Sequence, residues 1–149
     1  MENILTPDQQ EIRDAALRIA SKFGPDYWLE RDREGGFPDD FVADIAAGGW
    51  LGVAMPEEYG GSGGTYAHES AIIEAISHVG VDGFGIALHN SIVAPYIAHY
   101  GSEEQKKRWL PKMATGELIG AIAMTEPGAG SDLQGVKTRA VKDGNHYRI

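Results

Sequence analysis

Apolar residues recur at intervals of three and four positions through most of the first 116 residues. This spacing places them on one face of an amphipathic helix. The first such helix begins at a capping box, in which Thr6 is the cap, Pro7 lies in the first turn and Gln9 reaches back to the cap. Gly24 and Pro25 end it. By the same reasoning, helices are predicted over residues 7–23, 38–47, 65–79, 84–92, 95–100 and 103–110.

Prolines, glycines and charges interrupt these helices. The charged segment at residues 30–34 is predicted to be a solvent-exposed face, and the glycine-rich stretch at residues 50–64 is predicted to be a loop. Pro95 is expected to break its helix or to restart it one residue earlier, because proline lacks the amide hydrogen that a helix interior needs. Pro111 is expected to interrupt the last helix, which a second capping box at Ser102 introduces.

After Gly116 the pattern changes from helical to extended. Asp143-Gly144 is a strong hairpin signal, and the chain stops soon after it, which would leave an unpaired strand edge. The expected fold class is therefore mainly α, an amino-terminal helical bundle followed by the first strands of a β-domain, truncated. Strands are predicted over residues 118–125, 136–142 and 146–149.

The helix at residues 84–92 carries almost no charge. A helix without a polar face is buried on all sides or lines a cavity for an apolar group. Phe84, Leu88 and Ile92 share one face of it, and Gly85 leaves space beside them. Ordinary core packing is the commoner reason for such a face, and the sequence leaves both explanations open.

A formal net charge of -9 argues against nucleic acid as a partner, because a phosphate backbone would repel the chain. The absence of cysteine excludes disulfides, thiolate metal sites and cysteine nucleophiles. The five histidines show no metal-ligand spacing. No stretch approaches the roughly 18 uncharged apolar residues of a membrane helix, and the amino terminus is unlike a signal or transit peptide. These features predict a cytoplasmic protein without a membrane span or a bound metal.

The segment from Ala121 to Asp132 is the strongest candidate for chemistry. Its two glycines are free to take a positive φ, and its backbone amides could surround a polar or anionic group. Thr125 and Ser131 add hydroxyls that both donate and accept hydrogen bonds. A plain turn is the commoner explanation of such a loop. The dinucleotide-binding pattern Gly-x-Gly-x-x-Gly fails, because Leu133 occupies its last position.

The nine residues from Met124 to Asp132 resemble the flavin-binding signature of the acyl-CoA dehydrogenase family. The resemblance implies an amino-terminal α-helical domain at residues 1–116 and the beginning of an incomplete middle β-domain at residues 117–149. It also implies an FAD-dependent enzyme that oxidises an acyl-CoA thioester to the 2,3-enoyl-CoA, as in the beta-oxidation of fatty acids. Further blocks that agree with the family are Pro56 to Gly61, His89-Asn90-Ser91 with Pro95, Tyr100 to Lys106, and Asp143-Gly144.

Carried over position by position, the resemblance implies that Met124 offers backbone atoms to the flavin ring and that Thr125 places a hydroxyl near its N5 side. Ser131 would contact the CoA part of the substrate, and the apolar helix would wall the acyl tail. The implied cofactor-binding residues are Ile122, Ala123, Met124, Thr125, Glu126, Pro127, Gly128, Ala129, Gly130 and Ser131. The implied substrate-binding residues are Ser131, Phe84, Gly85, Leu88 and Ile92.

The resemblance also implies that the catalytic glutamate lies in a carboxy-terminal bundle beyond Ile149. This chain is therefore expected to hold no catalytic residue and to be inactive alone, with Glu126 holding the loop. Electron-transfer flavoprotein is the implied electron acceptor, and a homotetramer is implied for the full-length enzyme. Acyl-CoA oxidases and flavin monooxygenases share the scaffold and remain alternatives. From a different class, the chain could be a non-catalytic helical module that binds acyl-CoA or a protein.

Overall fold

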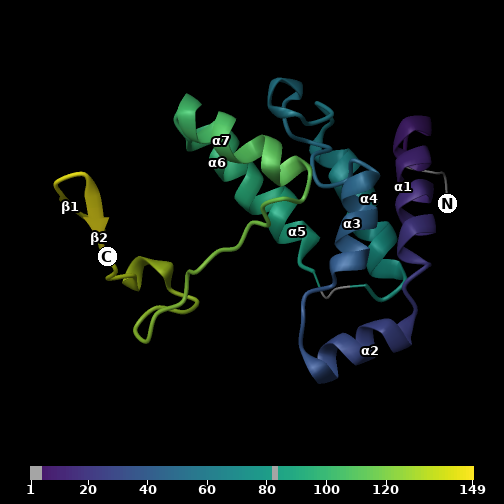
Figure 1. Ribbon diagram of the computed structural model, residues 1–149, viewed down its shortest axis with the longest axis horizontal. Helices are drawn as coiled ribbons and strands as arrows, with labels where there is room; N and C mark the ends of the chain where they lie inside the picture. The colour runs from purple at the N-terminus through teal and green to yellow at the C-terminus, as the bar shows by residue number, and fades with distance from the viewer. Residues whose placement is uncertain (1–4, 82–83) are drawn as a thin grey trace.

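The computed structural model describes residues 5–81 and 84–149. Its helices gather into one body, and the residues after Gly116 form an arm that leads away from this body and ends in a hairpin (Figure 1). The prediction of a mainly helical fold with a short β portion is confirmed. The α-helices are α1 (Pro7–Ala20), α2 (Pro25–Glu34), α3 (Asp39–Ala47), α4 (Tyr66–His78), α5 (Ile86–Leu88), α6 (Ala94–Tyr100) and α7 (Glu103–Ala114). The short elements are the 3-10 turns η1 (Glu57–Tyr59) and η3 (Leu133–Gly135), the π-helix η2 (His89–Val93), and the strands β1 (Val141–Asp143) and β2 (His146–Arg148).

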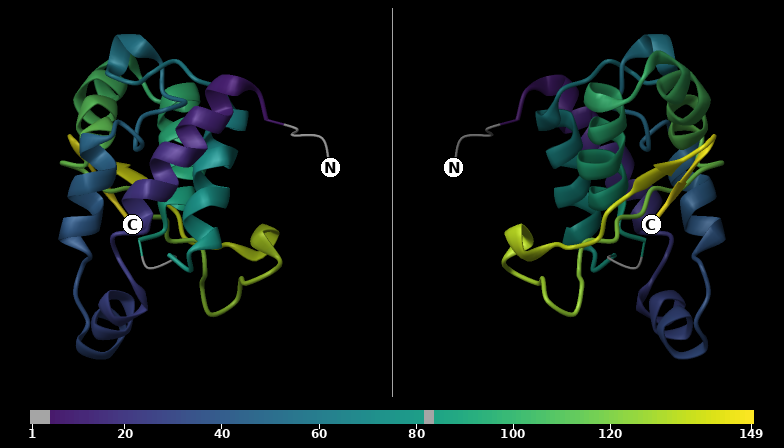
Figure 2. Two further views of the ribbon diagram at one scale, coloured as in Figure 1. Left: turned by 90° about the vertical axis from the view of Figure 1, so that its right-hand side faces the viewer. Right: turned by 90° about the vertical axis from the view of Figure 1, so that its left-hand side faces the viewer.

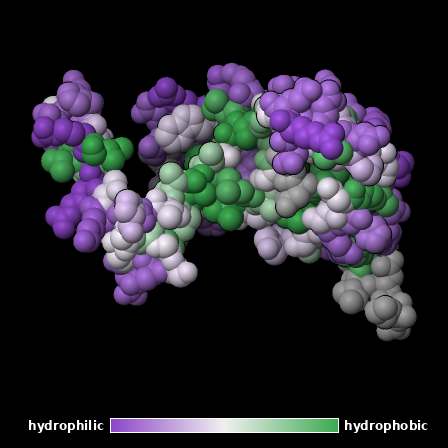
Figure 3. Space-filling view, turned by 90° about the horizontal axis from the view of Figure 1, so that it is seen from below, coloured by the Kyte–Doolittle hydropathy of each residue, from purple (hydrophilic) through white to green (hydrophobic). Residues whose placement is uncertain are grey.

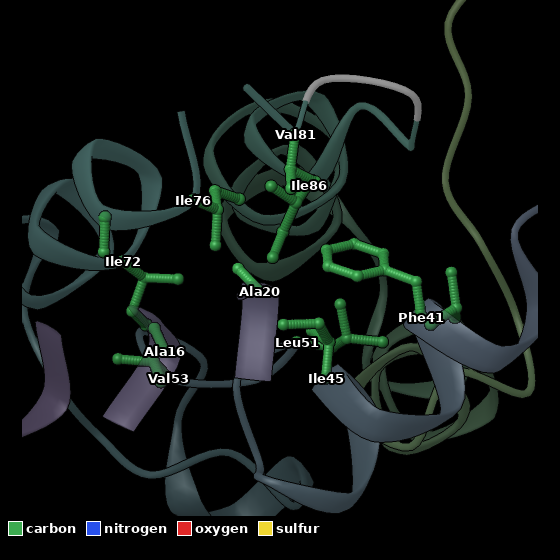
Figure 4. Packing of buried hydrophobic residues seen from close by; sticks show 12 residues of the cluster. Ala16, Ala20, Phe41, Ile45, Leu51, Val53, Ile72, Ile76, Val81 and Ile86 are labelled. Atoms are coloured by element: carbon green, nitrogen blue, oxygen red, sulfur yellow. The ribbon is translucent and has the colours of Figure 1, made fainter. Parts of the chain in front are cut away.

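The main core lies between α1, α3 and α4 (Figure 4). Ala16 and Ala20 are fully buried, and their small side chains let α1 lie close along α4, as both views in Figure 2 show. Phe41 and Ile45 of α3 fill the space beside them, and Ile72 of α4 is buried in the same cluster. Burying one phenylalanine or isoleucine side chain stabilises the fold by about 1.5–3 kcal/mol.

A second apolar cluster joins η1, α6 and α7. Leu110 and Met113 of α7 are buried in it together with Tyr59 of η1. The Tyr59 hydroxyl donates a hydrogen bond of 2.9 Å to Glu103 at the start of α7. This bond to a carboxylate, followed by burial, raises the pKa of Tyr59 to about 12. The glycine-rich loop is thereby fixed to the end of α7.

The charged segment at residues 30–34 belongs to a helix that the sequence pattern did not reveal. Pro25, which follows the end of α1, occupies the first position of α2, where a missing amide hydrogen has no cost. Trp28 of α2 lies edge-on to Phe41, with ring centroids 5.1 Å apart. Its Nε1 donates a hydrogen bond to the carbonyl of Phe23. Aromatic contacts and this hydrogen bond therefore hold α2 across the end of the body, since Tyr27 of α2 also lies edge-on to Phe23.

The two prolines expected to break helices act differently. At Pro95 the helix changes type, because the π-helix η2 is followed directly by α6 from Ala94. The π turn is wider than an α turn and so accommodates the proline ring beside the preceding carbonyls. The predicted restart at Ala94 is thus a change of winding without a gap. The prediction that Pro111 ends its helix is wrong, since α7 continues through it to Ala114.

The arm contains less strand than predicted. Residues 118–125 form no strand, and the strand expected at residues 136–142 is reduced to β1. β1 pairs antiparallel with β2, with Val141 opposite Arg148, and Gly144 in the turn has a φ of 61°. The hairpin prediction is confirmed. A strand is stabilised by hydrogen bonds to its neighbour, and residues 118–125 have no neighbouring strand among the residues that the structure describes.

Candidate functional site

The candidate segment is fastened to the helical body at Gly120. The Gly120 amide donates a hydrogen bond of 2.8 Å to Nδ1 of His89 in η2. A side chain at Gly120 would meet Val93 at 2.9 Å and the end of the Met113 side chain at 3.2 Å. Only glycine lets the chain pass this close to η2. The segment therefore leaves the body at a fixed point beside the nearly apolar helix.

His89 is fully buried and its second ring nitrogen is also bonded. Nε2 lies 3.2 Å from the carbonyl oxygen of Met113 in α7. Because Nδ1 accepts from an amide and Nε2 faces a carbonyl, the ring is the neutral tautomer with its proton on Nε2. Burial lowers the pKa of His89, with the bond to Met113 acting in the opposite direction. The sequence analysis placed His89 in a family block but did not predict this connection between two segments.

A buried polar network lies next to His89. Asn90 donates through Nδ2 to the carbonyl of Trp50 at 2.7 Å and to the Glu69 carboxylate at 2.8 Å. The other carboxylate oxygen of Glu69 accepts from the Ala54 amide at 3.1 Å. Burial raises the pKa of Glu69, and these hydrogen bonds oppose the shift. The network fixes η2 to α4 and to the loop that follows α3.

The motif itself is a turn closed by Glu126. The backbones of Glu126 and Ala129 exchange hydrogen bonds of 2.9 and 3.1 Å. The Glu126 carboxylate accepts from the amides of Thr138 and Lys137, both at 2.9 Å. These bonds hold the pKa of Glu126 below its ordinary value, and the interaction with Thr138 has the largest effect. The expectation that Glu126 holds the loop agrees with this geometry.

Three backbone amides of the motif are open. The amides of Gly128, Gly130 and Ser131 donate no hydrogen bond within the part of the chain that the structure describes. Neither glycine has a positive φ, and a side chain built on either would meet nothing within 4 Å. Neither the backbone conformation nor the packing of this chain requires glycine at these two positions. Their open surroundings leave space for a group that is not part of the described chain.

A hollow of about 480 Å³ lies on the arm beside the motif. Four implied flavin contacts, Ala123 to Glu126, line one side of it. Leu133, Val136 and Thr138 line the other side, and the sequence analysis did not identify them. Apolar surface is also exposed where the arm leaves the body (Figure 3), and Ile122 and Met124 are among the exposed apolar residues. The arm thus offers apolar walls and free polar groups together.

The predicted apolar face of the helix is divided in the structure. Ile92 is 44% exposed and Leu88 is half-buried, so both border open space. Phe84 instead contacts other rings, with centroid distances of 5.7 Å to Phe37 and 6.4 Å to Phe41. Gly85 has a φ of 68° and is the cap residue before α5. Core packing therefore accounts for much of Phe84, while Leu88 and Ile92 remain available on the surface.

Other kinds of site find no support in the described residues. Within residues 5–81 and 84–149, His, Asp and Glu side chains form no group of three or more that could hold a metal ion. No helix in this part of the chain is long and apolar enough to cross a membrane.

Known proteins match both the helical body and the arm. A family model described as acyl-CoA dehydrogenase, N-terminal domain, matches residues 6–117. The mitochondrial long-chain specific acyl-CoA dehydrogenase of Rattus norvegicus is 35% identical over 147 residues, which make up 99% of this chain and 34% of that protein. The Sus scrofa protein of the same name is 52% identical over 99 residues, or 66% of this chain and 23% of that protein. The chain therefore spans well under half of either relative.

Solved structures share the arrangement as well as the sequence. The crystal structure of an acyl-CoA dehydrogenase from Geobacillus kaustophilus has a TM-score of 0.89 and 44% identity, and the match covers 99% of this chain and 39% of that one. The prolyl acyl carrier protein oxidase AnaB has a TM-score of 0.80 and 27% identity, over 96% of this chain and 39% of that one.

Proposed function

Because this chain belongs to the acyl-CoA dehydrogenase family, we propose that it supplies the helical domain and part of the flavin site of an enzyme that oxidises an acyl-CoA to its 2,3-enoyl-CoA. One observation carries the proposal. The segment at residues 124–132 is held in place by Glu126, while the amides of Gly128, Gly130 and Ser131 remain open toward space that the described chain does not fill. That arrangement fits a ligand that approaches the backbone closely.

We assign FAD to this segment. Residues Ile122 to Ser131 would contact it, with backbone atoms of Met124 and the hydroxyl of Thr125 directed at the flavin ring and Ser131 at the CoA moiety. When bound, the flavin supplies the two-electron oxidising group that dehydrogenation requires. Hydrogen-bond donors fixed by the protein would stabilise the negative charge that the reduced ring acquires.

Leu88 and Ile92 are proposed to wall the acyl tail, with Phe84 behind them and Gly85 leaving space. Leu88 and Ile92 lie on the same stretch of helix as His89, whose ring bonds Gly120 at the start of the candidate segment. A substrate lying along this helix would therefore reach the flavin-binding segment at the same junction.

We propose that this chain contains no catalytic residue and is inactive by itself. The motif carboxylate, Glu126, is engaged by two backbone amides and is not free to remove a proton. The open hollow also encloses too little of a ligand the size of FAD for strong binding. Dehydrogenase turnover by the 149-residue chain would contradict the first statement.

Titrating FAD into the chain and into the complete protein tests the flavin assignment. Thr125→Val removes the proposed hydroxyl and should weaken FAD binding by roughly fivefold, the effect of one hydrogen bond of average net strength. Thr115→Val is the matched control, because Thr115 bonds only the end of α7. Equal binding by both variants would remove Thr125 from the site, and a complete protein without flavin would refute the assignment.

An acyl oxidase on the same scaffold is the second candidate, and the similarity to AnaB favours it. The two enzymes differ in how oxygen meets the reduced flavin, which this chain does not specify. A flavin monooxygenase is a related alternative. Reduction of a dye without oxygen indicates a dehydrogenase, whereas peroxide release in air indicates an oxidase.

A non-catalytic helical module that binds acyl-CoA or a protein would be colourless when purified as the complete protein.

For the enzyme, we propose electron-transfer flavoprotein as the acceptor and a homotetramer as the assembly. One similar solved structure carries the description of an electron transferring flavoprotein from Acidaminococcus fermentans. A cytoplasmic location stays a prediction, and the named rat and pig relatives are mitochondrial.

A further inference from the structure

We propose that His89 is a positioning residue, whose neutral ring fastens the start of the flavin-binding segment to the helical body by accepting a hydrogen bond from Gly120 while donating one to Met113. Its importance for flavin binding rests on the function proposed above. The fastening itself is a property of this chain and can be tested without any ligand.

The contacts of His89 connect three parts of the molecule. The ring is carried by η2, Nε2 reaches the last turn of α7, and Nδ1 reaches the arm. Hydrogen bonds to buried rings are costly to leave unmade, because the unpaired group stays out of water. With the ring 0% exposed, no solvent can replace either partner.

Other restraints on the arm close to this point do not extend as far. The Leu118 amide bonds the carbonyl of Lys112 at 3.0 Å, and Ile119 packs against the main core. After Gly120, the amides of residues 121–125 make no hydrogen bond in the part of the chain that the structure describes. The bond to His89 is thus the last hydrogen bond that a backbone amide of the arm donates before the turn at Glu126. It determines where the open segment begins.

The π-helical winding of η2 and its contact with Gly120 agree with this role. The π-helix spans His89–Val93, and such turns are frequent at functional sites. Val93, one turn after His89, forms the surface against which Gly120 lies. The same short element therefore provides both the acceptor for the Gly120 amide and the close contact that requires glycine there.

Two substitutions separate the two hydrogen bonds. In His89→Asn the side-chain oxygen is two bonds from Cβ, as Nδ1 is, so the acceptor for Gly120 is kept and the donor to Met113 is lost. In His89→Gln the amide nitrogen is three bonds from Cβ, as Nε2 is, so the donor to Met113 is kept and the acceptor for Gly120 is lost. Each variant loses one bond, so the two should lose similar global stability.

Amide hydrogen exchange of the 149-residue chain distinguishes the variants. Gly120 should exchange roughly fivefold faster in His89→Gln and at close to the wild-type rate in His89→Asn, because one hydrogen bond of average net strength changes the equilibrium by that factor. Gly120→Ala, which keeps His89 but collides with Val93, should release the segment as well. Equal acceleration in both His89 variants, or none in either, would overturn the proposal.

Two further readouts respond to positioning and not to general stability. Nitrogen-15 spectra of the His89 ring should show the proton on Nε2, and finding it on Nδ1 would refute the arrangement. Methyl spectra should show the Met124 signal shifting in His89→Gln but not in His89→Asn. In the complete protein, FAD should bind more weakly to His89→Gln than to His89→Asn. If the wild-type protein binds no flavin, the proposed function fails, while exchange at Gly120 still decides the role of His89.

Discussion

Polar side chains in this chain connect separate segments. Glu69 and Asn90 are 2% and 3% exposed, and together they join α4, η2 and the loop after α3. Asp8 at the start of α1 receives a hydrogen bond from His68 of α4 at 2.8 Å, and this bond lowers the pKa of Asp8 to about 2. Glu126 does the same for the arm. Glu69, Asn90 and Glu126 each bond backbone groups outside their own element, whereas Asp8 and His68 join two helices through their side chains.

Glu126 provides a prediction at this scale. Since its folded pKa lies below the unfolded value of 4.5, its stabilising effect is complete above about pH 4.5 and is lost as the pH falls through the folded pKa. The amides of Lys137 and Thr138 should therefore exchange faster under acid, after correction for the intrinsic exchange rate. Glu126→Gln, with one acceptor oxygen, should accelerate one of these amides roughly fivefold at neutral pH.

The neighbouring amides of β1 and β2 serve as the control, because they bond across the hairpin and not to Glu126. Unchanged exchange at Lys137 and Thr138 in the variant would show that the carboxylate does not hold the loop.

Capping residues near each end determine where the helices begin, whereas tertiary packing determines where the helices lie. The capping boxes at Thr6 and Ser102 are formed as expected. A third box at Thr65 uses His68, whose Nδ1 accepts from the Thr65 amide at 2.9 Å, in place of the usual glutamate or glutamine. Pro111, in contrast, lies inside α7 because packing against the second cluster outweighs the lost backbone bond.

Removing the cap of α7 should weaken the helical body. The Ser102 hydroxyl accepts from the Gln105 amide at 3.3 Å, and the Ser102 amide donates to the side-chain oxygen of Gln105 at 2.8 Å. Ser102→Ala should lower the free energy of unfolding by about 1 kcal/mol, measured by urea denaturation. Ser102→Thr keeps the hydroxyl and should stay near wild type. A loss as large in the threonine variant would point away from capping.

Pro111→Ala should have the opposite effect. The alanine restores an amide hydrogen for the carbonyl of Lys107, one turn earlier, which proline cannot supply. Allowing for the greater freedom of alanine in the unfolded chain, the gain should be about 2 kcal/mol. Thermal unfolding measures it. A destabilised variant would show that the proline ring contributes more by packing than it costs in hydrogen bonding.

At the scale of the whole molecule, the body and the arm differ in how they are stabilised. The two apolar clusters lie within the helical body, and Ile119 is the last residue packed against them. In residues 121–149, all of which the structure describes, only Ala129 is buried. The arm thus consists of backbone that is open to solvent and stabilised by local bonds.

A chain that ends at Gly120 should keep the cooperative unfolding of the full chain, with a midpoint temperature within about 3 °C, because less than 1 kcal/mol of core packing is removed. Trypsin should cut the 149-residue chain first in the arm, at exposed sites such as Lys137 and Arg139, and leave the helical body intact. Early cleavage within α1 or α4, or a large loss of stability on truncation, would contradict this division.

The sequence by itself determined the helices with strong apolar periodicity, their caps, and the hairpin at Asp143-Gly144, because these depend on residues near one another in the chain. It also carried the family signature at residues 124–132. Tertiary structure decided the rest. It placed α2 through the Trp28 contact with Phe41, left residues 118–125 without a partner strand, and brought His89 to Gly120 across 31 positions. Such contacts join residues distant in sequence, and no local pattern specifies which of them will meet.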